Sequence, residues 1–549
     1  MNDSTQIEQI RTGYAFESPS ATLGVLIDGG EPVSDAPIRI PLGMFNRHGL
    51  VAGATGTGKT VTLQVLAEAL SRAGVPVFAA DIKGDLSGIA TAPQPGEKLL
   101  ARTQAQGQPW AAESFPTEFF ALGGEGVGTP IRATVSAFGP ILLAKVLGLN
   151  QVQESSLGLV FHYADRAGLA LLDLKDLVEL LRYLTSDDGR AELKGIGGVS
   201  TATAGVILRS LVTLSDQGAD VFFGEPEFEP SELLRVAPDG RGVVSLLELP
   251  TLMSRPALFS TFLMWLLADL YSSLPEVGDQ DLPKLVFFFD EAHLLFDGAS
   301  KAFVDSVTQT VRLIRSKGVG IFFVTQTPKD VPDDILAQLG SRVQHQMRAH
   351  TPNDVKALKA TVATYPTSSY DLGALLQQLG IGEAVVTVMS ERGAPTPVAW
   401  TRIWAPTSQM GPTPEPQLQA IVAASPLKAR YGTPIDRESA YELLTERLAE
   451  GARKAEAESA QKADDERTKE AAEAAARQEK EFRRRQRELE QERARIEKQQ
   501  RADEAAQRKW EKENPTLVEQ VTGSPVFKDL MRTAGREIIR GIFGTGRRR

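Results

Sequence analysis

Residues 53–60 constrain the fold of this chain more than any other stretch. They read GATGTGKT and fit the pattern G-x-x-x-x-G-K-[ST] of a phosphate-binding loop (P-loop). A short apolar stretch, residues 49–52, precedes them, and residues 61–70 form a helix-favouring run directly afterwards. A Gly/Thr-rich turn before an ordinary helix is the alternative interpretation. Because strand, loop, Lys-Thr pair and helix follow one another in the required order, the sequence favours the P-loop.

The residue types of this loop match the chemistry of nucleotide binding. Glycines let backbone N–H groups point at phosphate oxygens, and the N-terminus of the following helix adds a favourable dipole. Lys59 is expected to reach the β- and γ-phosphates, and Thr60 to offer its hydroxyl to Mg²⁺. We therefore predict ATP and Mg²⁺ as cofactors. The predicted nucleotide-binding residues are Gly53, Ala54, Thr55, Gly56, Thr57, Gly58, Lys59, Thr60 and Val61.

A second motif indicates hydrolysis. The apolar run 285–289 ends in Asp290 and Glu291. This pattern fits a buried strand that carries two carboxylates to the carboxyl edge of a parallel sheet, where ligands bind. Asp290 is expected to hold Mg²⁺ through water, and Glu291 to act as the general base toward the attacking water. A solvated acidic turn after a buried strand is the alternative.

Two further polar residues follow predicted neighbouring strands. Gln326 comes after the run 320–325, at a position where a polar side chain can contact the γ-phosphate or orient water. Asp81 follows the strand expected at residues 75–80. It is a candidate either for the Mg²⁺ shell or for a turn-forming acid.

Phosphoryl transfer also gains from a cation that a neighbouring subunit supplies. Arg315 is the first candidate for this role, because it lies just before the strand that ends near Gln326, and Arg342 is the second. Either could instead be ordinary surface charge. The five histidines show no zinc-type spacing. For His48, which precedes the first core strand, we expect a structural or adenine-side role.

The order of strands and helices predicts an α/β fold with a parallel sheet covered on both faces. Residues 1–48 are expected to form a short β element, residues 49–405 the ATPase core with a helical insertion at about 136–234, and residues 406–436 a Pro-rich linker. Residues 437–512 are predicted to form a charged helical tail, followed by a basic segment at 513–549. Apolar heptads are sparse in the tail, so an exposed single helix and a coiled coil both remain open.

Composition narrows the class of protein. The 549 residues include no cysteine, which excludes disulfides and thiolate metal sites. The N-terminus lacks the features of a signal peptide, and the most apolar run, 257–271, is too short to span a bilayer. A cytoplasmic enzyme without a membrane partner is therefore expected. The net charge of −10 disfavours a surface that is basic overall, but it allows a local basic channel.

Together these motifs resemble the HerA/FtsK superfamily of P-loop ATPases, and within it the bacterial HerA-like, YjgR-type subfamily. The resemblance covers about residues 15–410. It implies a RecA-like P-loop NTPase core, Mg-ATP hydrolysis, assembly into a homo-oligomeric ring that is usually a hexamer, and translocation of duplex DNA. The region before the P-loop is too short for the full β-barrel domain of archaeal HerA, and the charged tail is not part of the shared core. The matching strings are residues 47–60, 81–86, 290–295 and 325–328.

Three functions follow from these observations. The first is a ring-forming motor ATPase that translocates or remodels DNA. The second is a ring ATPase with a protein client, as in secretion ATPases of the same superfamily. The third is a non-enzymatic scaffold in which the long C-terminal helix matters most. The intact Lys59, Thr60, Asp290 and Glu291 argue against the third, and only the resemblance favours DNA over protein.

Overall fold

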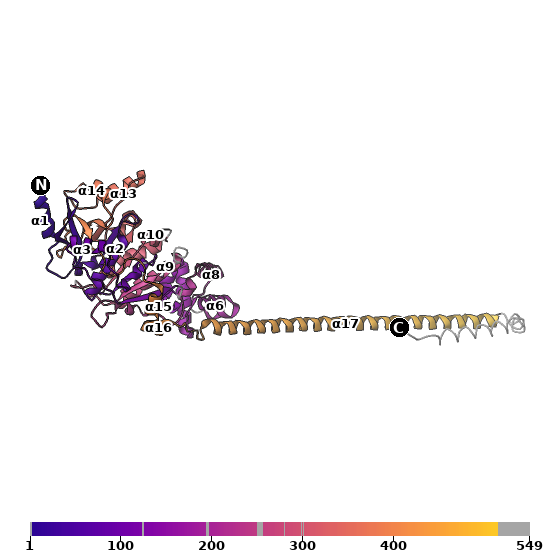
Figure 1. The fold of residues 1–549 in the computed structure, drawn as a ribbon. Helices are drawn as coiled ribbons and strands as arrows, with labels where there is room; N and C mark the ends of the chain where they lie inside the picture. The colour runs from indigo at the N-terminus through magenta and orange to yellow at the C-terminus, as the bar shows by residue number, and fades with distance from the viewer. Residues whose placement is uncertain are drawn as a thin grey trace. The chain divides into compact units, whose positions relative to one another are not determined.

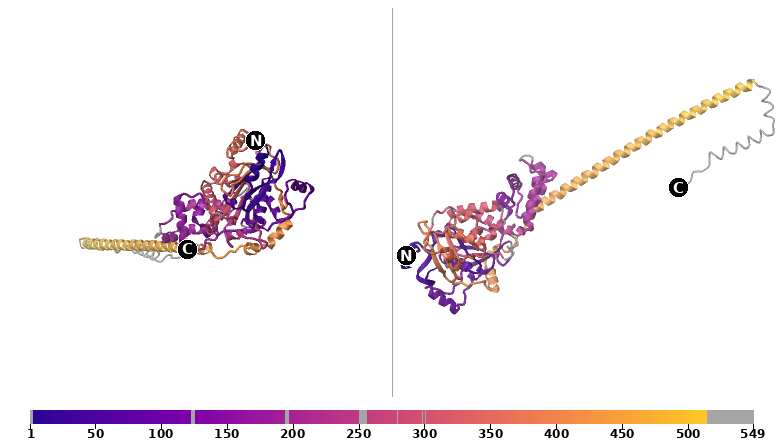
Figure 2. Two further views of the ribbon diagram at one scale, coloured as in Figure 1. Left: turned by 90° about the vertical axis from the view of Figure 1, so that its left-hand side faces the viewer. Right: turned by 90° about the horizontal axis from the view of Figure 1, so that it is seen from above.

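The computed structural model describes residues 3–122, 126–193, 197–249, 256–278, 280–297, 299 and 301–513. The chain forms two compact units, Met1–Ala449 and Glu450–Arg549. Figure 1 traces the helices and strands along the chain, and Figure 2 gives two further views. Among the described helices, none combines the length and apolar character that crossing a bilayer requires.

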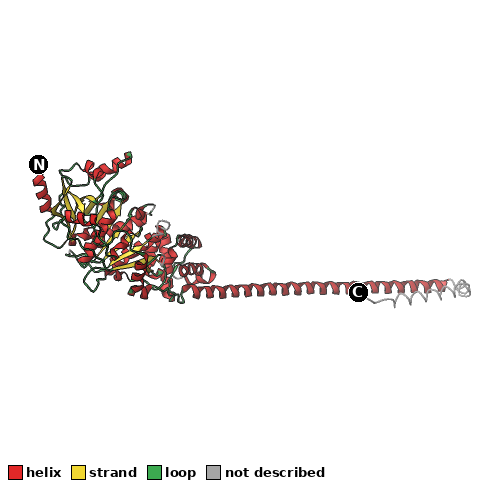
Figure 3. Ribbon diagram, in the orientation of Figure 1, coloured by secondary structure: helices red, strands yellow, loops and turns green. Residues whose placement is uncertain are grey.

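A single twelve-stranded sheet forms the centre of the first unit, with strand order β2-β1-β12-β11-β10-β3-β9-β8-β4-β7-β5-β6. In Figure 3 the strands lie among helices. The sheet confirms the predicted α/β class. The strands are β1 (Ser20–Asp28), β2 (Glu31–Pro41), β3 (Gly49–Ala52), β4 (Val77–Asp81), β5 (Thr117–Leu122), β6 (Thr129–Ile131), β7 (Val244–Glu248), β8 (Leu285–Phe289), β9 (Val319–Thr325), β10 (Ser341–Gln344), β11 (Glu383–Thr387) and β12 (Ala399–Ile403).

The eight strands from β10 to β6 run parallel, and their central members β3, β4, β8 and β9 are buried at every position. Continuous apolar runs such as residues 285–289 suit strands that helices cover on both faces. Because the strands are parallel, the P-loop after β3 and the acids after β8 lie at the same edge. The sheet therefore brings the sequence motifs together.

The other four strands, β2, β1, β12 and β11, pair antiparallel. Their pairing joins the N-terminal part of the chain to residues near 400. Strand β1 pairs with β2 and with β12, where Gly24 lies opposite Ile403. The N-terminal β element is thus an integral edge of the central sheet, and helix α1 (Asp3–Gly13) precedes it. Neither the helix α1 nor the pairing with β12 was predicted from the sequence.

The predicted helical insertion is confirmed. Helices α5 and α6 begin with complete capping boxes at Asn150 and Asp173, in which the cap side chain and the third helical residue exchange hydrogen bonds. The insertion shares an apolar core with α9 (Pro256–Ser273) and α11 (Lys301–Ile314). Its helices are α4 (Val135–Val146), α5 (Gln151–Ala167), α6 (Leu174–Thr185), α7 (Asp187–Leu193) and α8 (Thr201–Asp216).

Residues 406–436 do not form the linker that their proline content suggested. They contain α15 (Glu415–Ala424) and α16 (Pro426–Tyr431), which bury Leu418, Val422, Leu427 and Tyr431 against the sheet and the insertion. Prolines stand in the first turn of both helices, where the missing N–H costs nothing. The prolines therefore start helices here and do not mark a break between domains.

The stretch before α15 is tied to the P-loop helix α2 (Lys59–Arg72). The buried carboxylate of Glu68 accepts hydrogen bonds from the backbone N–H and the hydroxyl of both Thr407 and Ser408, at 2.6–3.1 Å. Gln64, one turn earlier in α2, donates to the Ser408 hydroxyl and to the Gln409 carbonyl. We call residues 407–409 the strap. Its hydrogen bonds hold the chain after β12 against α2.

The predicted charged tail is a single helix, α17 (Ala440–Glu513), of 74 residues. Its first turns belong to the first unit, because Ala440 and Leu444 are buried and the Tyr441 amide donates to Asp176 of α6 at 2.8 Å. Every described side chain from residue 452 onward is exposed. Exposed i,i+4 ion pairs such as Arg483–Glu479 and Arg501–Glu497 support the helix locally. The predicted basic segment lies almost wholly outside the described residues.

We expect two truncations to separate the anchoring turns of α17 from its exposed part. A chain that ends after Ala449 should unfold at the temperature of the full-length protein, because it keeps Ala440, Leu444 and the Asp176 contact. A chain that ends after Pro434 should unfold several degrees lower, because it exposes the apolar surface under Leu444 and removes a partner of a buried carboxylate. Differential scanning calorimetry measures both. Equal transition temperatures for the two truncations would contradict this role for the first turns.

Candidate nucleotide-binding site

The P-loop joins the carboxyl end of β3 to α2 and leaves its amides open. Gly56 and Gly58 have φ values of 81° and 115°, which glycine adopts without strain. No side chain caps α2, and within the described chain the amides of Gly56, Gly58, Lys59 and Thr60 donate to no protein acceptor. Uncapped amides at a helix N-terminus are suited to bind an anion. The loop therefore fits the phosphates of a nucleotide.

Lys59 lies over this loop. Its Nζ donates to the Gly53 carbonyl at 2.7 Å and to the Ala54 carbonyl at 3.3 Å. Burial lowers the pKa of Lys59, whereas the nearby carboxylates of Glu291 and Asp290 oppose that effect. A phosphate in the loop would offer the ammonium group oxygens in place of these carbonyls.

His345, a buried residue to which the sequence assigned no role, packs against the P-loop and α2. His345 follows β10, and its Nδ1 lies 2.7 Å from the Glu383 carbonyl while its Nε2 lies 2.8 Å from the Thr62 hydroxyl of α2. Burial lowers the pKa of His345 to about 4, so the ring is neutral at neutral pH. A Cβ at Gly53 would lie 2.5 Å from the His345 Cβ, so this P-loop position requires glycine. His345 therefore acts as a spacer beneath the P-loop.

The two acids after β8 occupy the same sheet edge. Both residues are 5% exposed, and the Glu291 amide donates to Asp290 Oδ1 at 2.9 Å. Burial raises the pKa of Asp290, and the charge of Glu291 adds to the increase. Glu291 has a φ of 47°, a left-handed conformation that is uncommon outside glycine. The local backbone strain thus occurs at the predicted general base, a kind of position where such strain is commonly found.

Lys83 is a functional candidate that sequence analysis missed. Its Nζ donates to Glu291 Oε1, and Nδ1 of His293 lies 3.3 Å from the other carboxylate oxygen. Burial acts to raise the pKa of Glu291, but the hydrogen bond and charge of Lys83, with Lys59, hold that pKa below its ordinary value. The sequence signals were the position of this lysine, two residues after a strand-end aspartate, and its place in the matching string 81–86.

Asp81 has the role of a turn-forming acid in the structure. Its two oxygens accept from the amides of Gly84 and Leu86, each at 2.8 Å. These bonds fix the turn that carries Lys83 toward Glu291. Burial raises the pKa of Asp81 to about 6 although the two amides oppose the increase. Glu248 pairs with Asp81 across β4 and β7, and burial, with the charge of Asp81, raises the pKa of Glu248 to about 7.

Thr60 and Asp290 are the side chains that could hold Mg²⁺ beside a nucleotide. Within the described residues no three His, Cys, Asp or Glu side chains form a metal-binding group. This sparse set fits Mg²⁺, which usually keeps several waters and takes further oxygens from substrate phosphates. The surplus of buried carboxylates at this edge also favours a cation.

The remaining predicted residues lie at different distances from the site: Gln326 is near the acids, and the two arginines are not. Gln326 is exposed and lines a cavity of about 420 Å³ with His293 and other residues, so it lies near the acids. Arg315 begins a turn (Arg315–Lys317) before β9, at the opposite end of that strand from Gln326. Arg342 lies on β10 and donates to the Thr364 hydroxyl. Neither arginine joins the site of its own subunit.

His48 has a structural role. It precedes β3, at the end of that strand remote from the P-loop, and is 2% exposed. Its Nδ1 accepts from the Ile321 amide and its Nε2 lies 2.7 Å from the Val311 carbonyl. Burial lowers the pKa of His48 to about 4.

Several solved structures are similar to this chain at low sequence identity. The bacterial conjugative coupling protein TrwBdeltaN70 in its unbound form is 16% identical, with a TM-score of 0.48 over 74% of this chain and 94% of that one. The same coupling protein in complex with ADP and Mg²⁺ is 17% identical, with a TM-score of 0.47 over 72% and 97%. VirB4 of Thermoanaerobacter pseudethanolicus is 14% identical, with a TM-score of 0.45 over 71% and 98%.

No curated protein sequence matches the chain significantly. The family described as "Helicase HerA-like C-terminal" matches residues 28–549, which is most of the chain. The matched region includes the P-loop, the turn with Lys83, the two acids after β8 and Gln326. The protein therefore belongs to the HerA-like helicase family, within the HerA/FtsK superfamily of P-loop ATPases.

Proposed function

We propose that this protein is a Mg²⁺-dependent ATPase that works as a ring-forming motor on DNA. The observation that carries the ATPase part of the proposal is the convergence of an open P-loop, Lys59 and Glu291 at one sheet edge. The ring and the DNA client are proposed from membership of the HerA-like family.

The proposed chemistry uses groups that the fold already holds in place. The open amides of the P-loop and Lys59 bind the phosphates, and Thr60 and Asp290 would hold Mg²⁺, which neutralises charge on the phosphate oxygens. Glu291, whose pKa the hydrogen bond and charge of Lys83 hold below its ordinary value, accepts a proton from the attacking water. Gln326 orients that water. Burial of the carboxylates strengthens each of these interactions.

Substitution of the P-loop lysine and of the proposed base should have different effects. Glu291→Gln should lower kcat at least ~100-fold while ATP affinity stays near the wild-type value, because only the proton acceptor is removed. Lys59→Ala should weaken ATP binding as well. Steady-state hydrolysis and titration with a fluorescent ATP analogue measure the two effects, with the exposed Glu97→Gln as control. Wild-type turnover by Glu291→Gln would show that another group is the base.

Substitution of Lys83 should change the pH profile of hydrolysis. Without the Lys83 hydrogen bond and charge, burial dominates and the pKa of Glu291 rises. The base is then protonated over a wider range, so in Lys83→Met the acid limb of the kcat profile should move to higher pH. The decrease in rate should be larger at pH 6 than at pH 8. Lys98→Met, an exposed lysine of α3 (Glu97–Ala105), is the control.

A Lys83→Met profile that runs parallel to wild type at every pH would limit Lys83 to a structural role. Nucleotide affinity, measured on the same protein, should stay unchanged, because Lys83 contacts Glu291, the proposed general base, and not the P-loop.

The proposed ring would place Arg315 against the nucleotide of the adjacent subunit. Its position at the far end of β9 supports action in trans, because it cannot reach its own P-loop from there. Mixing inactive Lys59→Ala with inactive Arg315→Ala protein should restore part of the activity, since some interfaces then carry both intact groups. The same mixture made with Arg342→Ala tests the second candidate. Full activity of a monomer, shown by light scattering with ATP present, would exclude the ring.

A further inference from the structure

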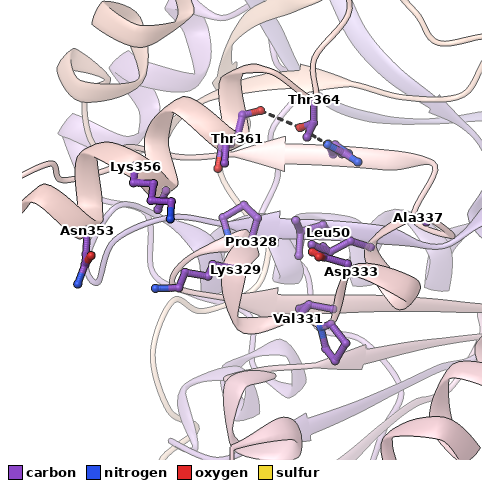
Figure 4. Close-up of a pocket in the computed structure, with 15 residues that line it drawn as sticks. Leu50, Pro328, Lys329, Val331, Asp333, Ala337, Asn353, Lys356, Thr361 and Thr364 are labelled. Atoms are coloured by element: carbon purple, nitrogen blue, oxygen red, sulfur yellow. Dashed lines mark hydrogen bonds between the residues drawn. The ribbon is translucent and has the colours of Figure 1, made fainter.

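A cavity of about 720 Å³ borders the strand that leads into the P-loop. Leu50 of β3 lines it, together with Val331 and Leu336 from the segment after β9. Its other wall is α13 (Pro352–Val362), which follows β10. Figure 4 shows Lys356 on α13 and Lys329 on the opposite wall, with Pro328 beside them. The cavity therefore has an apolar floor and cationic groups on both walls.

The charge of this cavity differs from that of the whole chain. Lys329, Arg342 and Lys356 line it, and Asp333 is the only carboxylate among the lining residues. The chain as a whole carries a net charge of −10. Lys329 and Lys356 are exposed, and neither forms an ion pair with a described residue. A concave surface with this local excess of positive charge attracts an anion.

The first wall leads directly to the site of hydrolysis. Lys329 lies three residues after Gln326, in a short turn (Pro328–Asp330). Asp330 accepts from the Thr325 hydroxyl at 2.7 Å and from the Thr327 amide at 3.1 Å, so the turn is fastened to the end of β9. A displacement of Lys329 by a bound ligand would therefore be transmitted to Gln326 through this short, hydrogen-bonded segment.

The second wall leads to the P-loop itself. The Ala54 amide of the P-loop donates to the Gln346 carbonyl at 2.9 Å, and Arg348 donates to the Thr55 carbonyl at 3.4 Å. The chain then enters α13 at Thr351, whose side chain caps the helix that carries Lys356. Both walls of the cavity thus begin at the nucleotide site.

We propose that this cavity binds backbone phosphates of a duplex DNA client and transmits their presence to the nucleotide site. The proposal rests on the proposed DNA function and names the surface that performs it. Lysines and an arginine bind phosphates without reading base sequence, and the apolar floor suits the deoxyribose between them. The coupling between the two binding equilibria is reciprocal: DNA in the cavity changes the affinity for ATP by the same factor by which bound ATP changes the affinity for DNA.

The test uses the full-length Lys329→Glu/Lys356→Glu protein. A labelled duplex is titrated with a non-hydrolysable ATP analogue present, over a series of salt concentrations, and hydrolysis is measured with and without DNA. DNA affinity at moderate salt should fall at least ~10-fold, and the log–log salt slope should become shallower by about 0.9 for each phosphate that the variant no longer binds. Stimulation by DNA should disappear while basal hydrolysis stays at the wild-type rate. Lys98→Glu/Arg209→Glu, two exposed cations on α3 and α8, gives the same change of charge as a control.

Each other outcome overturns a different statement. If the wild-type protein hydrolyses ATP but neither binds duplex DNA at low salt nor responds to it, the DNA function fails together with this inference. If wild-type protein binds DNA and the cavity variant binds and responds equally, only the inference fails, and another basic segment binds the duplex. An equal decrease of DNA affinity in the control variant would show that the change in net charge, and not the cavity, accounts for the effect. Stimulation by polyglutamate and not by DNA, absent in the cavity variant, would replace DNA by an acidic protein client.

Discussion

Negative charge buried at the carboxyl edge of the parallel sheet is the constraint on which the site depends. A buried carboxylate is costly unless hydrogen bonds or cations compensate it. Here backbone amides satisfy one acid, Lys83 pairs with a second, and Lys59 lies close to two of them. The negative charge that these groups do not compensate favours the binding of a divalent cation together with a nucleotide at this edge. The buried acids are Asp81, Asp290 and Glu291, and the partly exposed Glu248 lies beside Asp81.

The local chemistry of the site was predictable because it lies in contiguous strings. A P-loop and a strand that ends in two acids each carry their own spacing, and parallel pairing does the rest. The predicted loop and acids accordingly meet at one edge in the structure. Alternation of strands and helices was also sufficient for the α/β class, and sustained helical composition for α17.

What sequence could not supply were contacts between residues far apart in the chain. Lys83 meets Glu291 across 208 positions, and His345 meets Thr62 across 283. Neither has a local pattern, since a lone lysine or histidine is more often solvent-facing or simply packed. The error at residues 406–436 has a related cause. Proline signals both a break and a helix start, and only the buried partners of α15 and α16 distinguish the two.

The strap and the pairing of β1 with β12 set an order of events during synthesis. Strand β1 meets its second partner, β12, only when residues 399–403 have been made, and Glu68 of α2 gains its hydrogen bonds from the strap only with Thr407 and Ser408. Until then Glu68 has no hydrogen-bonding partner from the strap, and β1 presents a bare edge on one side. In a nascent chain shorter than about 410 residues the P-loop sequence is therefore complete, but the helix α2 that follows it lacks the hydrogen bonds from the strap. The ability to bind nucleotide would accordingly arise late on the ribosome, close to the moment when the core as a whole can close.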